Sequence, residues 1–182
     1  MGINDIIVWI LMICMVLGGL DRAIGNKFGL GEKFEEGFNA MGPLALSMVG
    51  VYALSPVLAK VLGPIVKPVY ELFGADPAMF AGTLLANDMG GWPLAQAMTD
   101  NPDAQRLSGL ILGAMMGATV VFTIPVALGI IDKSDRPFLA KGVLAGIVTI
   151  PIGVIVSGAA AGMPMGFVFV NVIPIILTAA LI

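Results

Sequence analysis

A short polar and helix-breaking run interrupts an otherwise apolar stretch of this chain. The stretch is bounded by Pro77 and Met98, and the run within it reads Asn87-Asp88-Met89-Gly90-Gly91-Trp92-Pro93. Its glycines and proline rule out a plain helix, and its aspartate places a charge at membrane depth. Membrane proteins tolerate broken backbone and buried charge only where these face protein or a water-filled cavity. We therefore expect a binding site here.

Asp88 is the strongest candidate for chemistry. A carboxylate at the bilayer centre costs several kcal/mol, so it must be paired, protonated or in contact with water. No Lys or Arg lies between residues 78 and 98, so the partner that we expect is a cation from outside the segment. The alternative is structural: Asp88 caps a half-helix that starts near Gly90 or Gly91, its carboxylate accepting backbone N–H bonds. The two roles can coexist.

Neighbouring side chains favour an organic cation. Trp92 lies four residues after Asp88, and an indole face attracts an ammonium group by about 0.5–2 kcal/mol. Asn87, Thr83 and Gln96 add amide and hydroxyl groups, which can donate and accept hydrogen bonds. Together these residues suit a small cationic amine with a polar end.

Composition indicates an integral membrane protein and excludes several functions. The chain is 58% hydrophobic and 12% charged, with a mean hydropathy of +1.00; soluble domains are about twice as charged. It has no histidine and a single cysteine, Cys14, so zinc sites built from Cys and His are excluded. Basic patches and enzyme motifs are missing as well. We therefore expect no enzyme activity, cofactor, metal or nucleic-acid partner.

Hydropathy predicts an all-α, polytopic fold with about five spans and one interrupted segment. The stretch 25–38 carries charges on one side and apolar residues four apart on the other, which suits a helix lying in the membrane interface; a solvated loop is the alternative. The predicted elements form a single transmembrane domain over 1–182: span 1 at 1–24, the interfacial helix at 25–38, span 2 at 39–63, the interrupted segment at 78–98, span 3 at 107–131, span 4 at 139–161 and span 5 at 165–182.

Loop charges favour a re-entrant course for the interrupted segment. If it enters and leaves on one side, six Lys or Arg residues share one face of the membrane and three lie on the other; if it crosses, the split is four against five. The first distribution agrees better with the excess of positive charge on the cytoplasmic side. This arrangement places the N-terminus outside.

Small residues and prolines shape the later spans. Gly109, Gly113 and Gly117 form a double small-xxx-small run, which lets another element approach closely. Thr123 and Thr149 each stand two residues before a proline, where a hydroxyl can satisfy a carbonyl that the proline frees. We interpret both features as architecture.

Several blocks of the chain resemble the bacterial ethanolamine-utilisation permeases (EutH-like). The blocks occur in order at residues 33–42, 80–92, 108–116, 124–131 and 142–153. The resemblance implies a multi-pass inner-membrane protein that imports ethanolamine. Asn87 stands where we expect some members to have cysteine, which makes it a weaker site candidate. Trp92 stands where we expect some members to have phenylalanine, and an aromatic residue at that position agrees with the cation–π hypothesis.

Family members are about twice as long, and this chain is still apolar at Ile182. We expect it to be the N-terminal half of a permease, with ethanolamine, the lipid bilayer and the missing C-terminal half as partners; a homo-oligomer is left open. Two other functions are open: a channel or facilitator that passes the uncharged amine, and a membrane assembly subunit that transports nothing.

Overall fold

The computed structural model describes residues 2–181, apart from the side chains at positions 44, 47, 48, 51 and 181. Over that range the regular secondary structure is entirely helical, so the predicted all-α class is confirmed. The chain divides into two compact units, Met1–Ser47 and Met48–Ile182.

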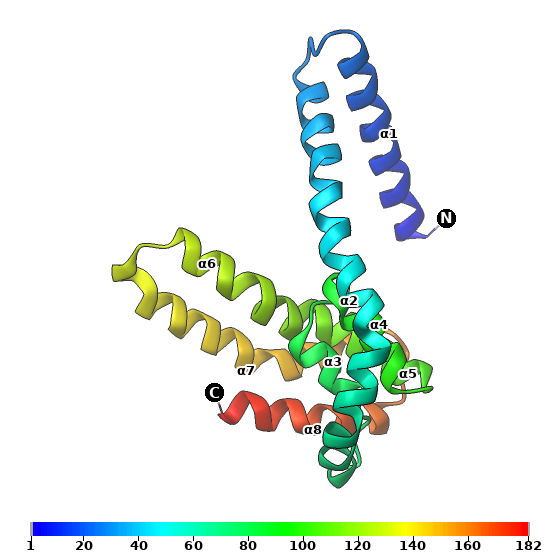
Figure 1. Ribbon diagram of the computed structural model, residues 1–182, viewed down its shortest axis with the longest axis vertical. Coiled ribbons are helices and arrows are strands. Elements are labelled where there is room, and N and C mark those ends of the chain that lie inside the picture. The colour runs from blue at the N-terminus through cyan, green and yellow to red at the C-terminus, as the bar shows by residue number, and fades with distance from the viewer. Residues whose placement is uncertain (1, 182) are drawn as a thin grey trace. The chain divides into compact units, whose positions relative to one another are not determined.

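The first unit is a pair of antiparallel helices: α1 (Ile3–Ala23) and the beginning of α2 (Leu30–Leu72) (Figure 1). Asp21 organises the connection between them and is only 2% exposed. Its carboxylate accepts hydrogen bonds from the backbone N–H groups of Phe28, Leu30 and Gly31, at 3.0, 2.9 and 2.9 Å. The bonds from Leu30 and Gly31 satisfy donors in the first turn of α2 that have no partner inside the helix, and the bond from Phe28 fixes the loop before it.

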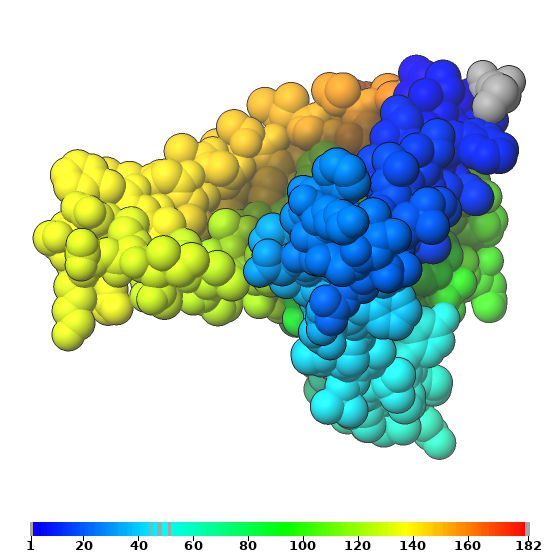
Figure 2. All heavy atoms as spheres, turned by 90° about the horizontal axis from the view of Figure 1, so that it is seen from above, coloured from blue at the N-terminus to red at the C-terminus, as the bar shows by residue number. Residues whose placement is uncertain are grey.

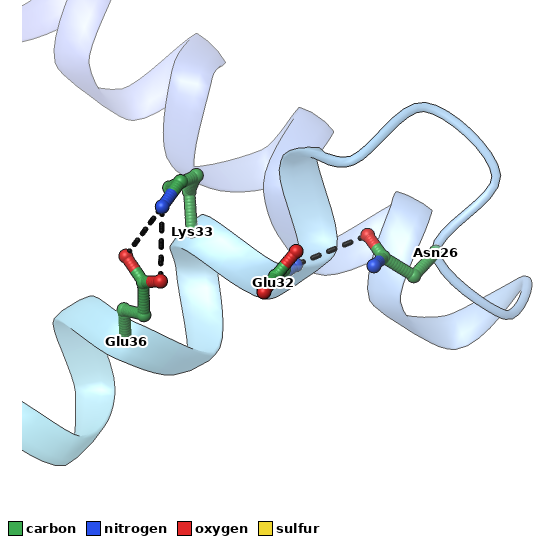
Figure 3. A network of polar contacts seen from close by, with 4 residues as sticks. All are labelled: Asn26, Glu32, Lys33 and Glu36. Atoms are coloured by element: carbon green, nitrogen blue, oxygen red, sulfur yellow. Dashed lines mark hydrogen bonds and ion pairs between the residues drawn. The ribbon is translucent and has the colours of Figure 1, made fainter.

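Exposed polar contacts line the first turns of α2 (Figure 3). The Asn26 side chain accepts a hydrogen bond from the Glu32 N–H at 3.0 Å. The Lys33 ammonium lies 2.8 Å from a Glu36 carboxylate oxygen, and this hydrogen bond raises the pKa of Lys33. Such surface pairs stabilise a helix only slightly.

The structure differs from the sequence prediction between residues 25 and 63. A separate interfacial helix at 25–38 and a span at 39–63 were expected, but α2 runs without interruption over 43 residues. The expectation rested on a change from charged to apolar side chains near residue 38. Such a change alters the preferred environment of a helix but does not itself break a backbone hydrogen bond. The helix also continues through four prolines, each of which lacks an N–H: Pro43, Pro56, Pro64 and Pro68.

The second unit begins within α2 and contains the interrupted segment and the last three predicted spans. Its later elements are α3 (Met79–Leu84), η1 (Asn87–Gly91), α4 (Trp92–Met98), α5 (Pro102–Gln105), η2 (Arg106–Gly117), η3 (Thr119–Thr123), α6 (Ile124–Ile130), η4 (Lys133–Asp135), α7 (Arg136–Ala160) and α8 (Met165–Leu181). Elements α5 to α6 form one continuous helical rod, Pro102–Ile130, which we call the central rod. Its middle part has wider, π-helical turns.

Three helices are long and apolar enough to cross a membrane among the residues that the structure describes: Ile3–Ala23, Pro102–Ile130 and Lys133–Ala160. A shorter apolar helix, Met165–Ala180, falls in the region predicted as span 5; residue 182 lies outside the described range. The total of five spans stays a prediction.

The apolar core of the second unit lies where the central rod, α7 and α8 meet. Leu107, Leu112 and Met116 from the rod are almost completely buried there, with Val154 from α7 and Val168 from α8. Away from this core, α6 and α7 run side by side and are joined by the turn at η4 (Figures 1 and 2). The core holds the central rod in place, and the interrupted segment packs on that rod.

Candidate functional site

The interrupted segment consists of two short helices separated by two extended residues and the distorted turn η1. Helix α3 has six residues and α4 has seven, so each is only about 9–10 Å long at 1.5 Å per residue. Between them, Leu85 and Ala86 have extended conformations, with ψ of 136° and 150°. Neither helix alone could cross a hydrocarbon core of about 30 Å.

Glycines are required where the backbone turns back toward α4. Gly90 has a φ of 104°, a left-handed conformation that residues with a Cβ rarely adopt. A Cβ on Gly91 would lie 2.6 Å from the Leu85 carbonyl oxygen. The Ala86 carbonyl accepts hydrogen bonds from the N–H groups of Met89 and Gly91, at 3.1 and 2.8 Å, which closes the turn.

Asp76 joins the two ends of the interrupted segment. Its carboxylate accepts a hydrogen bond from the Thr99 hydroxyl at 2.8 Å and another from the Ala78 N–H at 2.9 Å. Its own N–H donates to the Asn171 side-chain oxygen at 2.7 Å. Because Asp76 and Thr99 are in contact, residues 77–98 leave and return at one point, and we call this segment the hairpin.

The glycine run of the central rod packs directly against the hairpin. A Cβ on Gly109 would lie 2.9 Å from the Trp92 Cα, and one on Gly113 would lie 3.0 Å from the Asn87 nitrogen. A Cβ on Gly117 would overlap the Leu85 carbonyl group. The small-xxx-small run therefore lets a broken backbone, as well as a helix, approach closely.

Ser108 of the central rod inserts its hydroxyl into the hydrogen bonding of α3. The hydroxyl accepts a hydrogen bond from the Gly82 N–H at 3.0 Å and donates one to the Ala78 carbonyl. These two backbone groups are four residues apart, so they would bond to each other in an ordinary α-helix. Ser108 is fully buried, and it fixes α3 to the rod.

A cavity of about 230 Å³ lies between the turn of the hairpin and the central rod. The hairpin contributes Ala86, Asn87, Asp88 and Met89, and the rod contributes Ala114, Ala118 and Phe122. Asp88 is exposed, and no hydrogen bond or ion pair engages its carboxylate within residues 2–181. The cavity thus presents one carboxylate whose bonding capacity is unused.

The five predicted site residues divide into two groups. Asn87 and Asp88 line the cavity, whereas Trp92, Thr83 and Gln96 do not. The Trp92 ring packs over Gly109. The Thr83 side chain is buried and donates to the Met79 carbonyl at 2.8 Å. Gln96 is exposed on α4. No observation tests whether any of the five binds a substrate, so that role stays a prediction.

The structure excludes the capping alternative for Asp88. Helix α4 begins at Trp92 after Gly91, and no side chain accepts a hydrogen bond from its first N–H groups. Pro93 occupies the first turn and lacks an N–H. Asp88 therefore stands before the helix without bonding to it.

Comparison with known proteins identifies the family of the chain. Residues 3–182 match the family described as "Ethanolamine utilisation protein, EutH". The chain belongs to this family. The resemblance inferred from the sequence blocks is thereby confirmed.

Relatives of this EutH-family chain are closely similar in sequence. It is 61% identical over its whole length to the "Probable ethanolamine permease EutH" of Listeria monocytogenes and 53% identical to the protein of that name in Escherichia coli. It is 52% identical to the "Uncharacterized protein YxeR" of Bacillus subtilis. The chain covers 49%, 51% and 49% of these proteins, about half of their lengths. No solved structure matches it.

In this EutH-family chain, one aromatic residue of the cavity was not identified from the sequence. Phe122 lies on the central rod, 34 residues beyond Asp88 in the numbering, and lines the same cavity. With Ala114 and Ala118 it follows a spacing of four, which places the three residues along one face of a helix. That spacing, next to the glycine run, was the available signal. The cavity combines a carboxylate, an amide and an aromatic ring and has no basic residue, so it suits a small organic cation.

Proposed function

We propose that this chain forms part of a permease that imports ethanolamine across the bacterial inner membrane, and that the amine binds beside Asp88. The observation that carries the proposal is an exposed carboxylate without a partner, in a cavity at a broken helix of a membrane protein. Broken helices form the substrate sites of many transporters. The names of the Listeria and Escherichia relatives agree with the proposed substrate.

The hairpin geometry supports the re-entrant course proposed for residues 78–98. The hydrogen bond between Asp76 and Thr99 brings the start and the end of the hairpin together. A segment that begins and ends at one point returns to the side of the membrane from which it came. In this arrangement the turn containing Asp88 is the deepest part of the hairpin, and the cavity lies within the bilayer.

The side chains of the cavity have complementary roles in holding the amine. Asp88 pairs with the ammonium group, and the Asn87 amide hydrogen-bonds the hydroxyl at the other end. Phe122 offers an aromatic surface to the cation. Trp92, Thr83 and Gln96 lie away from the cavity, so we propose that they contribute only after the hairpin rearranges during transport.

The direct test is uptake of labelled ethanolamine by cells that lack their own permease and express the full-length protein with Asp88→Asn. The substitution keeps the shape of the side chain and removes its charge. Losing a charge-assisted hydrogen bond of about 1.5–3 kcal/mol predicts a reduction in uptake of roughly 10- to 150-fold at low ethanolamine concentration. Wild-type uptake at normal expression would refute the assignment of Asp88.

Asp132→Asn is the matched control. Asp132 is also an exposed acid, and it lies in the turn after α6, outside the cavity. This control should keep wild-type uptake. A facilitator for the uncharged amine would instead show uptake that rises steeply with external pH and is insensitive to Asp88→Asn, which would replace the permease proposal.

A further inference from the structure

A second cavity in the Met48–Ile182 unit carries the opposite charge. It has a volume of about 350 Å³ and lies between α2 and the two ends of the hairpin. Lys60, Gly63, Pro64 and Lys67 line it from α2; these positions share one face of a helix because they are spaced i, i+3, i+4 and i+7. Ala59, Pro77, Ala97 and Met98 complete the lining.

The lining is small in its middle and basic at both ends. Gly63 has no side chain, and nothing lies within 4 Å of the position where its Cβ would be. Two lysines flank this middle part. Lys60 precedes Gly63 by about one helical turn, and Lys67 follows Pro64 by about one helical turn. A compact group can therefore reach the surface of the helix between two ammonium groups.

Neither ammonium group is engaged by the protein. Within the described part of the chain, the ion pairs are Arg22–Glu35 and Lys33–Glu36, and no hydrogen bond involves the ammonium group of Lys60 or of Lys67. No acidic residue lines the cavity. Glu71 follows Lys67 by one turn of α2, but the two residues form no ion pair.

We propose that this cavity binds a phosphate ester group, with Lys60 and Lys67 neutralising its charge. Lysine is a common ligand of phosphate, and lysines near a membrane surface attract anionic phospholipid headgroups. The site lies beside Pro77 and Met98, where the hairpin begins and ends, away from the cavity of Asp88. An anion there contacts both α2 and the hairpin and holds them together.

The experiment measures ligands retained by the full-length protein in native mass spectrometry. Detergent-purified protein is incubated with phosphatidylglycerol, with phosphatidylcholine or with inorganic phosphate. We expect Lys60→Gln and Lys67→Gln each to weaken phosphatidylglycerol binding by about fivefold, and the double variant by about 25-fold. Lys141→Gln on α7 is the matched control, because Lys141 is exposed and outside the cavity.

The remaining outcomes identify the ligand or overturn the proposal. Millimolar phosphate that displaces the lipid from wild type, but not from the double variant, would identify a soluble phosphate compound as the occupant. A double Lys→Arg variant should retain binding, which separates loss of charge from loss of folding. Equal retention by wild type and by a monodisperse Lys60→Gln/Lys67→Gln variant would overturn the proposal. Uptake by Asp88→Asn tests the proposed function independently, since Asp88 is not part of this cavity.

Discussion

Replacing Gly117 by alanine should displace the turn of the hairpin from the central rod. The added Cβ would overlap the Leu85 carbonyl and come within 2.8 Å of the Ala86 nitrogen. Both are backbone atoms, so no side-chain rotation can relieve the overlap. The hairpin must move away, and the wall of the Asp88 cavity formed by Ala86 moves with it.

The magnitude follows from two opposing effects. Alanine is more favourable than glycine in a helix by about 1 kcal/mol, so a Gly→Ala substitution in a helix stabilises the protein by that amount when no contact opposes it. Overpacking of a close contact costs about 1–3 kcal/mol or more. Gly146→Ala on α7 is the matched control, because nothing lies within 4 Å of its Cβ position. The free energy of unfolding of Gly117→Ala should therefore be about 1–3 kcal/mol below that of Gly146→Ala.

The assay combines thermal unfolding of the detergent-purified protein with ethanolamine uptake by cells. Gly113→Ala should be intermediate, since its Cβ would lie 3.0 Å from the Asn87 nitrogen. Gly117→Ala should lose most uptake, and Gly146→Ala should keep it. Equal stability and equal uptake of Gly117→Ala and Gly146→Ala would refute the close packing between the glycine run and the hairpin.

Two further predictions concern the ends of the hairpin and its cavity. Asp76→Ala removes two hydrogen-bond acceptors, so it should lower the free energy of unfolding by about 2–4 kcal/mol and speed hydrogen exchange at the α3 amides. Thr99→Val should have about half this effect. Unchanged exchange in Asp76→Ala, or the same increase in the exposed control Asp100→Ala, would contradict the role of Asp76. Phe122→Leu should raise the KM for ethanolamine by about two- to fivefold through loss of the aromatic face. The control Phe138→Leu, on the exposed start of α7, should leave the KM unchanged. An unchanged KM in Phe122→Leu would exclude a contact between Phe122 and the amine.

Local sequence signals predicted the broken segment well. Three residues of the break act on the backbone at their own positions. Gly90 adopts a left-handed φ, Gly91 allows a close approach, and Pro93 lacks an N–H. An apolar composition with few charges likewise indicated a helical membrane protein. Such features can be recognised without knowing which elements meet in space.

The composition of the cavity could not be predicted in the same way. Trp92 was expected beside Asp88 because it follows four residues later in the same segment and its indole face attracts an ammonium group. Residues at this spacing lie together where the backbone is helical. That rule fails across Gly90, where the backbone is not helical, and the aromatic residue of the cavity is Phe122 instead. The contact between Asp76 and Asn171 joins residues 95 positions apart, and no local pattern indicates it.

Composition and local residue patterns were enough to recognise a helical membrane protein that resembles the EutH family, with an acid at a break in an apolar segment. Hydropathy and backbone preference are properties of single residues and short windows, so they are visible in one dimension. The packing of the folded chain was needed to show that the glycine run contacts the broken backbone and that the Ser108 hydroxyl hydrogen-bonds to backbone groups of α3. It also placed Phe122, rather than Trp92, in the cavity of Asp88. Those contacts depend on which helix faces pack together, and packing joins residues that are distant in the chain.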